Sequence, residues 1–364
     1  MMVVSKQHQI FFEFLRFCIG SAKDIPSSLK EADWKELYRI AQKQCLVGIL
    51  FDGIQKLPLA EVGMSKDLLL QWMLQCQMLE KANVRLNDAA IQVSEWFRKK
   101  GFRTCILKGQ GNALMYPNPY SRTPGDIDIW VEGGDKRVIS FVRSISPHEK
   151  ACYHHIEFPS YKGVEVEVHY RPSFLLCFWH NRKLQKYYER VKEEQFSHRV
   201  MLGEQGEIAI PTVEFNLIFQ LTHIYAHLMN EGIGLRQLLD YYYVLISDDL
   251  LLIRDRVQKE LKELGLWKFA GAIMYIMQEV FGMPASRLIV PPNEKYGKFV
   301  LNEVLEAGNF GKHDERNRFG KSKLGHNFQR VYRDMRLVRY FPAEALSEPI
   351  FRVWHFFWRL KHRR

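Results

Sequence analysis

The chain has 364 residues, of which 47% are hydrophobic and 13% aromatic, so it can bury a substantial core and is not an intrinsically disordered protein. Its formal net charge of +11 suggests an anionic partner such as a nucleotide, a nucleic acid or a membrane surface. Most of this charge is local, because residues 308–364 hold 14 Lys and Arg against 5 Asp and Glu. The rest of the chain is close to neutral.

The six cysteines are scattered and form no CxxC pair, which favours reduced thiols. Charged and polar residues interrupt residues 1–20, so this segment is not typical of a secretory signal peptide. No apolar run approaches the roughly 20 residues that a transmembrane helix needs. The sequence therefore predicts a cytoplasmic protein without a transmembrane segment, whose end could still touch a membrane surface.

Helices are predicted for the first 100 residues. Within residues 8–62, residues 33–41 place Trp34, Leu37 and Tyr38 on one helical face. A longer helix is expected over residues 66–99, where apolar residues recur at intervals of three and four. They predict a stripe packed in the core, made of Leu69, Trp72, Met73, Cys76, Leu79, Leu86, Ala90, Val93 and Phe97.

The pattern changes after residue 101. Residues 104–107 predict a short apolar strand, and residues 112–116 predict the start of a helix. Between them lies a turn with two glycines, made of Lys108, Gly109, Gln110 and Gly111. A strand, a glycine-containing turn and a helix start together direct backbone N–H groups toward a place where a phosphate can sit. Such junctions are common, so a purely structural turn is the simpler interpretation of this segment alone.

Residues 125–131, which read GDIDIWV, contain the strongest functional motif. Asp126 and Asp128 lie two apart between β-forming residues, so in a strand their side chains point to the same face. Paired carboxylates at this spacing can hold a divalent cation such as Mg²⁺. The alternative is an edge strand with a solvated acidic face. A proline-rich loop containing Arg122 leads into this strand.

A helix capped by Asp135 is predicted for residues 135–146, and two strands follow at residues 151–158 and 164–170. The second strand alternates valines with polar residues, so one face is buried and the other is rich in carboxylates. That polar face carries Glu165, Glu167 and His169. The two glutamates face the same way, and either could supply a third carboxylate.

From residue 211 the chain is predicted to be helical again. Thr212 can cap a helix that runs to about residue 231. This helix is mostly apolar, with one polar stripe made of Asn216, Gln220, His223, His227 and Asn230. The histidines lack the Glu of the HExxH zinc motif, so a histidine pair in the core or a cleft is favoured over a metal site.

More helices are expected over residues 235–246, 250–264 and 267–281. In the first of them, Arg236 and Asp240 stand four apart, which is the spacing of a plain surface salt bridge.

Residues 308–364 form a basic and aromatic tail. Arginines recur every three residues, at Arg330, Arg333, Arg336 and Arg339. Aromatic and basic residues then interleave, namely Phe351, Arg352, Trp354, Phe357, Trp358, Arg359, Lys361, Arg363 and Arg364. Three interpretations stay open: a surface that binds nucleic-acid backbone, an interfacial membrane helix, or a C-terminal helix that docks its aromatic residues on the body.

The glycine turn at residues 108–111, the GDIDIWV strand and the later strand with Glu167 together resemble the polymerase-beta-like nucleotidyltransferase superfamily. Members carry a strand, a Gly-rich turn, a DxD or DxE strand and a third carboxylate on a later strand. The phrases LKGQGNALMYPNPYSRTPGDIDIWV, EVHYRP and HIYAHLMNEGIGLRQLLDYYYVL resemble more closely a bacterial family of nucleotidyltransferases. The resemblance covers about residues 30–250. The sequence departs from the superfamily at Gln110, where Ser or Gly is usual, and in its long spacing to Asp126.

The resemblance implies an α+β fold, in which a small mixed β-sheet nucleotidyltransferase core is flanked by N-terminal helices and a C-terminal helical domain. We expect a helical region in residues 1–100 and the catalytic core in residues 101–210. A helical domain would follow in residues 211–307, and the basic aromatic tail would occupy residues 308–364.

The resemblance also implies a reaction. A nucleoside monophosphate would pass from an NTP such as ATP to an acceptor hydroxyl of a small molecule, RNA or protein, with release of pyrophosphate. Asp126 and Asp128 would hold two Mg²⁺ ions, with Mn²⁺ as an alternative, and Glu167 would complete the catalytic set. Glu167 is chosen because the family has an acid two residues before the position of His169. The implied nucleotide-binding residues are Lys108, Gly109, Gln110, Gly111, Arg122, His223, His227, Arg236 and Asp240.

Two hypotheses come from other classes. A metal-dependent glycosyltransferase also uses a DxD motif between apolar residues, but the long helical lead-in replaces its usual N-terminal nucleotide-binding α/β unit. A non-catalytic module would use residues 308–364 to bind nucleic acid or an anionic membrane, and that binding would weaken steeply with salt.

Overall fold

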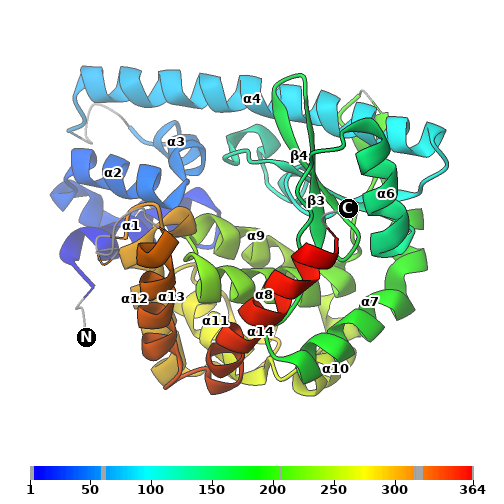
Figure 1. The fold of residues 1–364 in the computed structure, drawn as a ribbon. Helices are drawn as coiled ribbons and strands as arrows, with labels where there is room; N and C mark the ends of the chain where they lie inside the picture. The colour runs from blue at the N-terminus through cyan, green and yellow to red at the C-terminus, as the bar shows by residue number, and fades with distance from the viewer. Residues whose placement is uncertain (1–3, 59–62, 205, 315, 317–322, 363–364) are drawn as a thin grey trace.

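The computed structural model describes residues 4–58, 63–204, 206–314, 316 and 323–362 (Figure 1). Four strands form a small mixed sheet in the order β1-β2-β4-β3. They are β1 (Thr104–Ile106), β2 (Ile127–Val131), β3 (His155–Tyr161) and β4 (Val164–His169). β2 pairs antiparallel with β1 and parallel with β4, and β3 pairs antiparallel with β4. Helices surround this sheet, which confirms the predicted α+β fold class.

The N-terminal helices are α1 (Lys6–Cys18), α2 (Trp34–Gln44), α3 (Val47–Ile54) and α4 (Lys66–Lys99), with a short 3-10 helix η1 (Ser27–Glu31). Helix α4 has the predicted bounds and runs along the top of the molecule in Figure 1, from α3 to the sheet. Its second half buries Leu86, Val93 and Phe97. Its first half is less buried than predicted, because Met73 remains 38% exposed.

The elements that connect the strands are α5 (Gln110–Ala113), η2 (Pro119–Ser121) and α6 (Gly134–Ile145). Helix α6 begins one residue before the predicted cap: Gly133 is the N-cap, and Asp135 lies in the first turn, where its carboxylate pairs with Arg171 at 2.9 Å. After the sheet come α7 (Phe178–Ser197) and a hairpin of β5 (Arg199–Leu202) with β6 (Gly206–Ala209), which the sequence patterns above did not predict.

The next helices are α8 (Val213–Asn230), α9 (Leu235–Leu245), α10 (Leu250–Glu263), α11 (Trp267–Glu279) and α12 (Glu294–Ala307). The predicted cap is present, since the Thr212 side chain accepts a hydrogen bond from the backbone N–H of Phe215. The 3-10 helices η3 (Ala285–Arg287) and η4 (Asn309–Gly311) lie before and after α12.

The sheet separates two hydrophobic cores among the described residues. One face, with Ile129 and Val168, packs on the second half of α4 and on α6. The other face, with Trp130, joins a larger core in which α1–α3 and α8–α12 pack together. Because side chains alternate along a strand, Asp128 lies on the same face as Trp130 and points toward the helices.

Helices α13 (Lys323–Leu337) and α14 (Pro342–Lys361) form most of the tail. In Figure 1, α14 crosses the front of the molecule, and its C-terminal end comes close to β3. Four basic residues of the predicted tail lie outside the described residues: Arg318, Lys321, Arg363 and Arg364. Within the described part of the chain, no helix combines the length and the apolar character needed to cross a membrane.

Candidate functional site

The parallel pairing of β2 with β4 brings three carboxylates together. The register places Asp128 opposite Glu167, and Asp126 directly precedes β2. Oxygen atoms of Asp126, Asp128 and Glu167 all lie within 4.8 Å of one another. Glu165, near the start of β4, is exposed to solvent. Of the two glutamates that the sequence left open, it is therefore Glu167 that lies beside the aspartates.

Two basic side chains contact Asp128, whose exposed fraction is 2%. Lys108 Nζ lies 3.0 Å from Asp128 Oδ2. His169 Nε2 lies 3.0 Å from Asp128 Oδ1 and 3.3 Å from Glu167 Oε2. Burial acts to raise the pKa of Asp128, but Lys108 and His169 outweigh burial and hold that pKa below its ordinary value. Burial alone would lower the pKa of His169, but its hydrogen bonds to the two carboxylates raise it to about 9.

Asp126 is less well compensated. The negative charge of Asp128 and then burial raise the pKa of Asp126, and the nearby Lys108 offsets this only in part. The same carboxylates raise the pKa of Lys108, even though burial acts to lower it. The cluster thus has more negative charge than its cationic neighbours neutralise. Its donors are all hard carboxylate oxygens, the ligand type that Mg²⁺ and Mn²⁺ prefer, so the residues fit such an ion.

Two histidines extend this cluster along the sheet. His155 pairs with His169 in the register of β3 with β4, and His155 Nδ1 lies 3.4 Å from Glu167 Oε2. Burial and the neighbouring His169 lower the pKa of His155 to about 4. Sequence reasoning used His169 only to choose between two glutamates and did not identify His155 as a site residue. The sequence contained a signal for His155. Polar residues alternate with apolar ones in β4, and His155 pairs with one of these polar residues, His169.

Only the first two residues of the glycine turn, Lys108 and Gly109, line the site. Gly109 has φ +59°, a conformation that favours glycine, and a Cβ there would lie 3.4 Å from the backbone oxygen of Asp126. Lys108 and Gly109 line the cavity beside the carboxylates. The side chain of Gln110 is instead buried against α4, where it bonds Asn87. Gly111 packs on Ile210, so Gln110 and Gly111, both predicted to contact nucleotide, lie outside that cavity lining.

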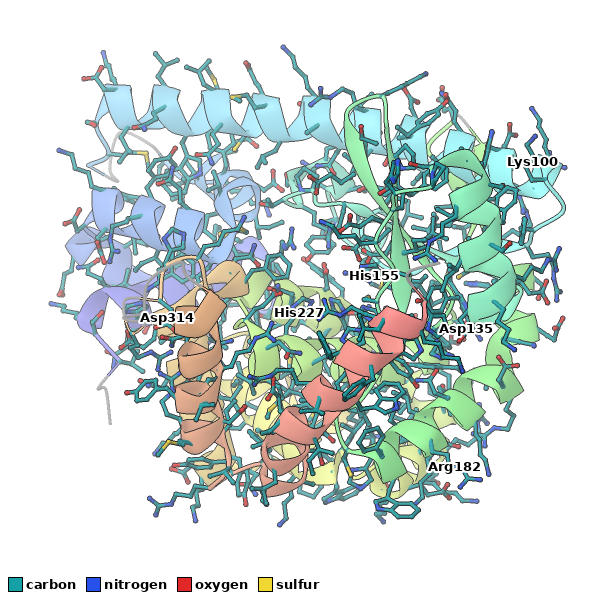
Figure 2. All side chains as sticks on the ribbon, in the orientation of Figure 1. Lys100, Asp135, His155, Arg182, His227 and Asp314 are labelled. Atoms are coloured by element: carbon teal, nitrogen blue, oxygen red, sulfur yellow. The ribbon has the colours of Figure 1, made fainter. Side chains whose placement is uncertain are left out.

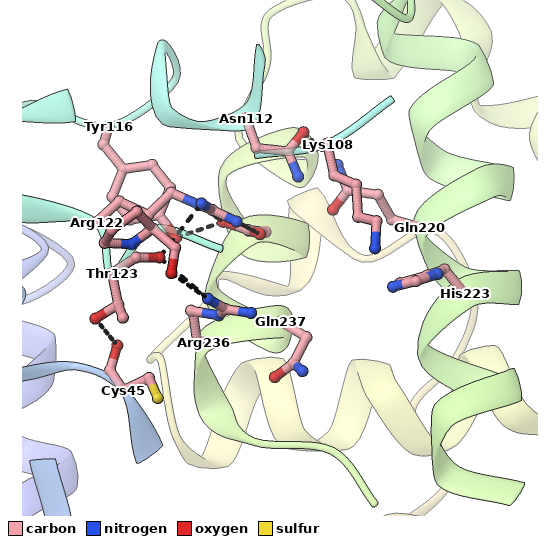
Figure 3. Close-up of polar contacts among 12 residues, drawn as sticks. Cys45, Lys108, Asn112, Tyr116, Arg122, Thr123, Gln220, His223, Arg236 and Gln237 are labelled. Atoms are coloured by element: carbon pink, nitrogen blue, oxygen red, sulfur yellow. Dashed lines mark hydrogen bonds and ion pairs between the residues drawn. The ribbon is translucent and has the colours of Figure 1, made fainter. Parts of the chain in front are cut away.

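Arg122 and Asp240 form a buried ion pair (Figure 3). Arg122 Nε and Nη2 donate to the two oxygens of Asp240 at 2.8 and 2.7 Å, and the Tyr116 hydroxyl donates to Asp240 Oδ1 at 2.7 Å. The spacing of Arg236 and Asp240 left a plain surface salt bridge as the simple alternative to a place in the cleft. That alternative does not hold, because Asp240 is buried and its ion-pair partner is Arg122. The pair fixes the proline-rich loop on α9, and Asp240 already neutralises the charge of Arg122, although both residues line the cavity.

Arg236 lies beside this pair without a carboxylate of its own. Arg236 Nη1 donates to the backbone oxygens of Thr123 and Pro124 at 3.1 and 3.3 Å. Its Nε is buried and makes no hydrogen bond, and no carboxylate of the described chain lies within ion-pair distance of the guanidinium. Burial and the neighbouring Arg122 lower the pKa of Arg236. A bound anion would satisfy both the buried charge and the unused donor.

Two residues of the α8 polar stripe, Gln220 and His223, line the same cavity, whereas His227 lies outside that lining. Gln220 donates to Asn112 Oδ1 at 3.0 Å, which joins α8 to α5. The side chain of His223 points toward Lys108 in Figure 3. Burial and then Lys108 lower the pKa of His223 well below its ordinary value, so this ring is neutral. His227 Nε2 lies 3.0 Å from His223 Nε2. Figure 2 shows His227 on the helical side of the molecule and His155 on the sheet.

The cavity between sheet and helices is narrow, with a volume of about 30 Å³. This is room for about one water, whereas ligand pockets span about 300–1,000 Å³. Phe310, in η4, lies along its lining. The Phe310 ring lies 5.6 Å from the Arg236 guanidinium and 5.0 Å from the His227 ring. Phe310 has φ 54°, which is strained for a residue with a side chain.

A family model described as "Uncharacterised nucleotidyltransferase" matches residues 30–282. The matched range contains the three carboxylates, Lys108 and Arg236. The chain belongs to this nucleotidyltransferase family. The family match begins just before α2 and ends before α12, so the tail lies beyond it.

One solved structure resembles this nucleotidyltransferase, an antigenic nucleotidyltransferase-like protein from Paracoccidioides brasiliensis. The two share 15% sequence identity over 50% of this chain and 92% of the other, with a TM-score of 0.28. At that score the likeness does not bear on function. Comparison with curated protein sequences gave no match.

Proposed function

We propose that this nucleotidyltransferase moves a nucleoside monophosphate from an NTP to an acceptor hydroxyl and releases pyrophosphate. The observation that carries the proposal is the cluster of Asp126, Asp128 and Glu167. Two of its members, Asp126 and Asp128, line a cavity whose other side contains Arg236. Carboxylates suit a divalent cation and the guanidinium suits a phosphate, so the two halves match the two ends of a metal-bound triphosphate.

In this proposal Asp126, Asp128 and Glu167 would hold Mg²⁺, with Mn²⁺ as an alternative and two ions as the complete set. When bound, the metal supplies positive charge beside the reacting phosphorus and the attacking and leaving oxygens. His169 contacts both Asp128 and Glu167, so it holds two of the three carboxylates in place. This is the positioning role that residues behind metal ligands commonly have.

The chain's own cations would bind the phosphates. Arg236 Nε has an unused hydrogen-bond donor, and a phosphate oxygen would satisfy it. Lys108, now 3.0 Å from Asp128, would turn from that carboxylate to the β- or γ-phosphate once a metal takes its place. Glu167 would accept the proton of the acceptor hydroxyl. The acceptor oxygen then bonds the α-phosphorus in line with the breaking bond to the β-phosphate, and pyrophosphate leaves.

Nucleotide binding requires the cavity to widen. Phe310 is the residue that we expect to move, because its ring covers Arg236 and its backbone is strained in the present conformation. Displacement of the ring would uncover the guanidinium for phosphate. The same ring could then stack on the base of the nucleotide.

The glycosyltransferase alternative has less support. The sheet described here has four strands with mixed directions, and the N-terminal part of the described chain is helical. Nucleotide-sugar binding of the expected kind would need a parallel α/β unit there. Since NTPs are available in the cytoplasm and the six cysteines are free thiols, we propose the cytoplasm as the place of reaction.

The test is pyrophosphate release from each NTP, with ATP first, in the presence of Mg²⁺ and candidate acceptors. We expect Asp128→Asn and Glu167→Gln each to lower the rate at least about 100-fold, because the metal contributes several kcal/mol to the transition state. Glu165→Gln is the matched control on the same strand and should keep the wild-type rate. Equal rates for Glu167→Gln and Glu165→Gln would contradict the proposal.

A further inference from the structure

Helix α14 presents its polar side chains to the body of the protein. The carboxylate of Glu344 is buried and accepts the backbone N–H of Leu176 at 2.6 Å and that of Cys177 at 3.3 Å. One helical turn further, Glu348 is also buried and pairs with Arg352. These contacts place the charged side of the helix inward, where a surface helix normally places its apolar side.

The second half of α14 continues this orientation. His355 Nε2 accepts the backbone N–H of Tyr153 at 3.1 Å. The ring of Phe351, which is buried, stacks on Phe174 with 5.1 Å between ring centroids. The docked side of α14 is thus fixed to the segment before β3 and to the segment before α7. Its opposite side must therefore face outward.

The outward side of α14 is apolar along nearly its whole length. From Pro342 to Phe357 the exposed residues of the helix include no charged side chain. Five of the apolar ones recur at spacings of four, three, four and three and are between 43% and 64% exposed: Leu346, Ile350, Val353, Phe357 and Leu360. Residues at this spacing form one continuous stripe on a helix.

Aromatic residues of α7 extend this stripe. Phe178 lies 5.7 Å from Trp354 between ring centroids, and the neighbouring Trp179 is 76% exposed. We call these two residues together with the α14 stripe and Trp354 the α14 patch. An exposed apolar surface of this extent marks an interaction site, because soluble monomers rarely leave one uncovered.

The charge around the α14 patch favours an anionic lipid surface as its partner. Exposed Arg359 and Lys361 lie at the C-terminal end of α14, exposed Arg330 lies on α13, and exposed Arg339 lies in the link between the two helices. Each basic residue near an anionic leaflet adds to binding, while Leu, Ile, Phe and Trp side chains insert at the boundary of the acyl chains. Tryptophan is also enriched at that boundary.

Two other partners fit less well. A nucleic acid needs many phosphate contacts, and the outward stripe of α14 has neither hydrogen-bond donors nor cations before Arg359. A second copy of the chain would bring two strongly basic tails together, since residues 308–364 hold 14 Lys and Arg against 5 Asp and Glu.

We propose that the α14 patch binds an anionic membrane surface, with α14 lying in the plane of the interface rather than across the bilayer. This inference does not depend on the reaction proposed above, because none of the patch residues belongs to the carboxylate cluster or lines its cavity.

Vesicle flotation with the full chain tests the proposal. One set of vesicles is phosphatidylcholine, and the other is phosphatidylcholine mixed with phosphatidylglycerol. We expect the protein to float with the anionic set and to lose at least about 10-fold in partition coefficient when Ile350→Glu and Phe357→Glu are combined. Leu252→Glu on α10 is the matched control, since Leu252 is 79% exposed and lies outside the patch. It should float like the wild type.

A second variant tests the electrostatic part. Combining Arg359→Glu with Lys361→Glu leaves the apolar stripe intact, and we expect it to lower binding to the anionic vesicles while circular dichroism stays unchanged. Flotation of Ile350→Glu/Phe357→Glu at the wild-type level would overturn the proposal. The proposal would also be overturned if the wild type did not bind anionic vesicles and instead formed a concentration-dependent dimer or bound a single-stranded oligonucleotide, and if this variant lost that interaction. These results would assign the patch to a second copy or to nucleic acid.

Discussion

Arg122 and Arg236 border the same cavity but have different electrostatic environments. Arg122 is neutralised by both oxygens of Asp240, whereas Arg236 donates hydrogen bonds to backbone oxygens only and keeps a buried donor unpaired. The first arginine therefore stabilises the fold, and the second is available for an anion. Sequence reasoning assigned both to nucleotide binding and could not separate them, because Asp240 is four residues from Arg236 but is contacted by Arg122 from a distant loop.

We predict that Arg236→Gln weakens NTP binding by about 10–100-fold, because a hydrogen bond to a charged group contributes about 1.5–3 kcal/mol. Isothermal titration calorimetry with ATP and Mg²⁺ measures this change. The same substitution removes an unpaired buried cation, so the thermal unfolding temperature should not fall. Unchanged ATP affinity in a folded Arg236→Gln protein would remove Arg236 from the nucleotide site.

Arg122→Gln should behave in the opposite way. It leaves the buried carboxylate of Asp240 without its cation, which costs about 3–5 kcal/mol of unfolding free energy. Urea unfolding followed by tryptophan fluorescence gives that number. Combining Arg122→Met with Asp240→Leu should restore much of the loss, because both charges are then absent. Wild-type stability in Arg122→Gln alone would show that the ion pair does not hold the loop.

Among the elements, those with a regular apolar period were predicted well. Helix α4 has its predicted bounds, and the spacing of Asp126 and Asp128 placed both carboxylates on one face of a strand. What the sequence could not supply is pairing between distant segments. The parallel register of β2 with β4 makes Glu167 the neighbour of Asp128, and a strand taken alone presents Glu165 on the same face.

For helix α14, too, the sequence does not show which distant segment the helix contacts. The sequence shows aromatic and basic residues interleaved after residue 350, which is compatible with either face being docked. Contacts of Glu344 and His355 with the body determine that the polar face is inside. A hydrophobic period alone predicts the reverse, because burial of apolar side chains is the usual reason a helix docks.

The contact between α13 and α14 should depend on pH. Burial and the adjacent negative charge of Glu348 raise the pKa of Asp334 to about 7. The folded protein therefore holds this proton more tightly than the unfolded chain, where the pKa is near 3.8. The stability that it contributes is complete below the unfolded pKa and is lost as the pH rises through the folded one.

We predict that Asp334→Asn, which mimics the protonated carboxyl, becomes relatively more stable as the pH rises. The difference in unfolding temperature between Asp334→Asn and wild type should increase by on the order of 2 °C from pH 5 to pH 8. Differential scanning calorimetry at matched ionic strength measures it. A difference that is constant with pH would mean that Asp334 titrates in its ordinary range when folded.

At the scale of the whole molecule, the candidate site lies where the two hydrophobic cores meet. The turn after β1 supplies Lys108, and Asp126 and Asp128 come from the start of β2, while α8 and α9 supply His223 and Arg236 from the other side. This explains why the sequence predicted the clustering of the carboxylates better than the arrangement of the helical residues: the first follows from strand periodicity, and the second depends on how helices pack against the sheet. No sequence pattern predicts how narrow the cavity is.

Because the cavity is too small for a nucleotide, binding should change the protection of residues 308–314, which include Phe310. We predict that ATP with Mg²⁺ increases hydrogen exchange in peptides from this segment while peptides from β2 keep their protection. Mass spectrometry after brief exchange measures both. ATP with EDTA in place of Mg²⁺ is the control and should leave the segment as in the free protein. Identical exchange with and without ATP and Mg²⁺ would mean that the nucleotide enters by another route.

The buried pair of Arg122 with Asp240 also has a consequence for the newly made chain. The two residues are separated by 118 positions, so during synthesis Arg122 emerges from the ribosome well before its counter-charge exists. At about 5–20 residues per second, the delay lasts from several seconds to tens of seconds. Until α9 has been made, the loop that leads into the acidic strand has no ionic anchor. The sheet can form early, but the site becomes complete only after most of the chain has left the ribosome.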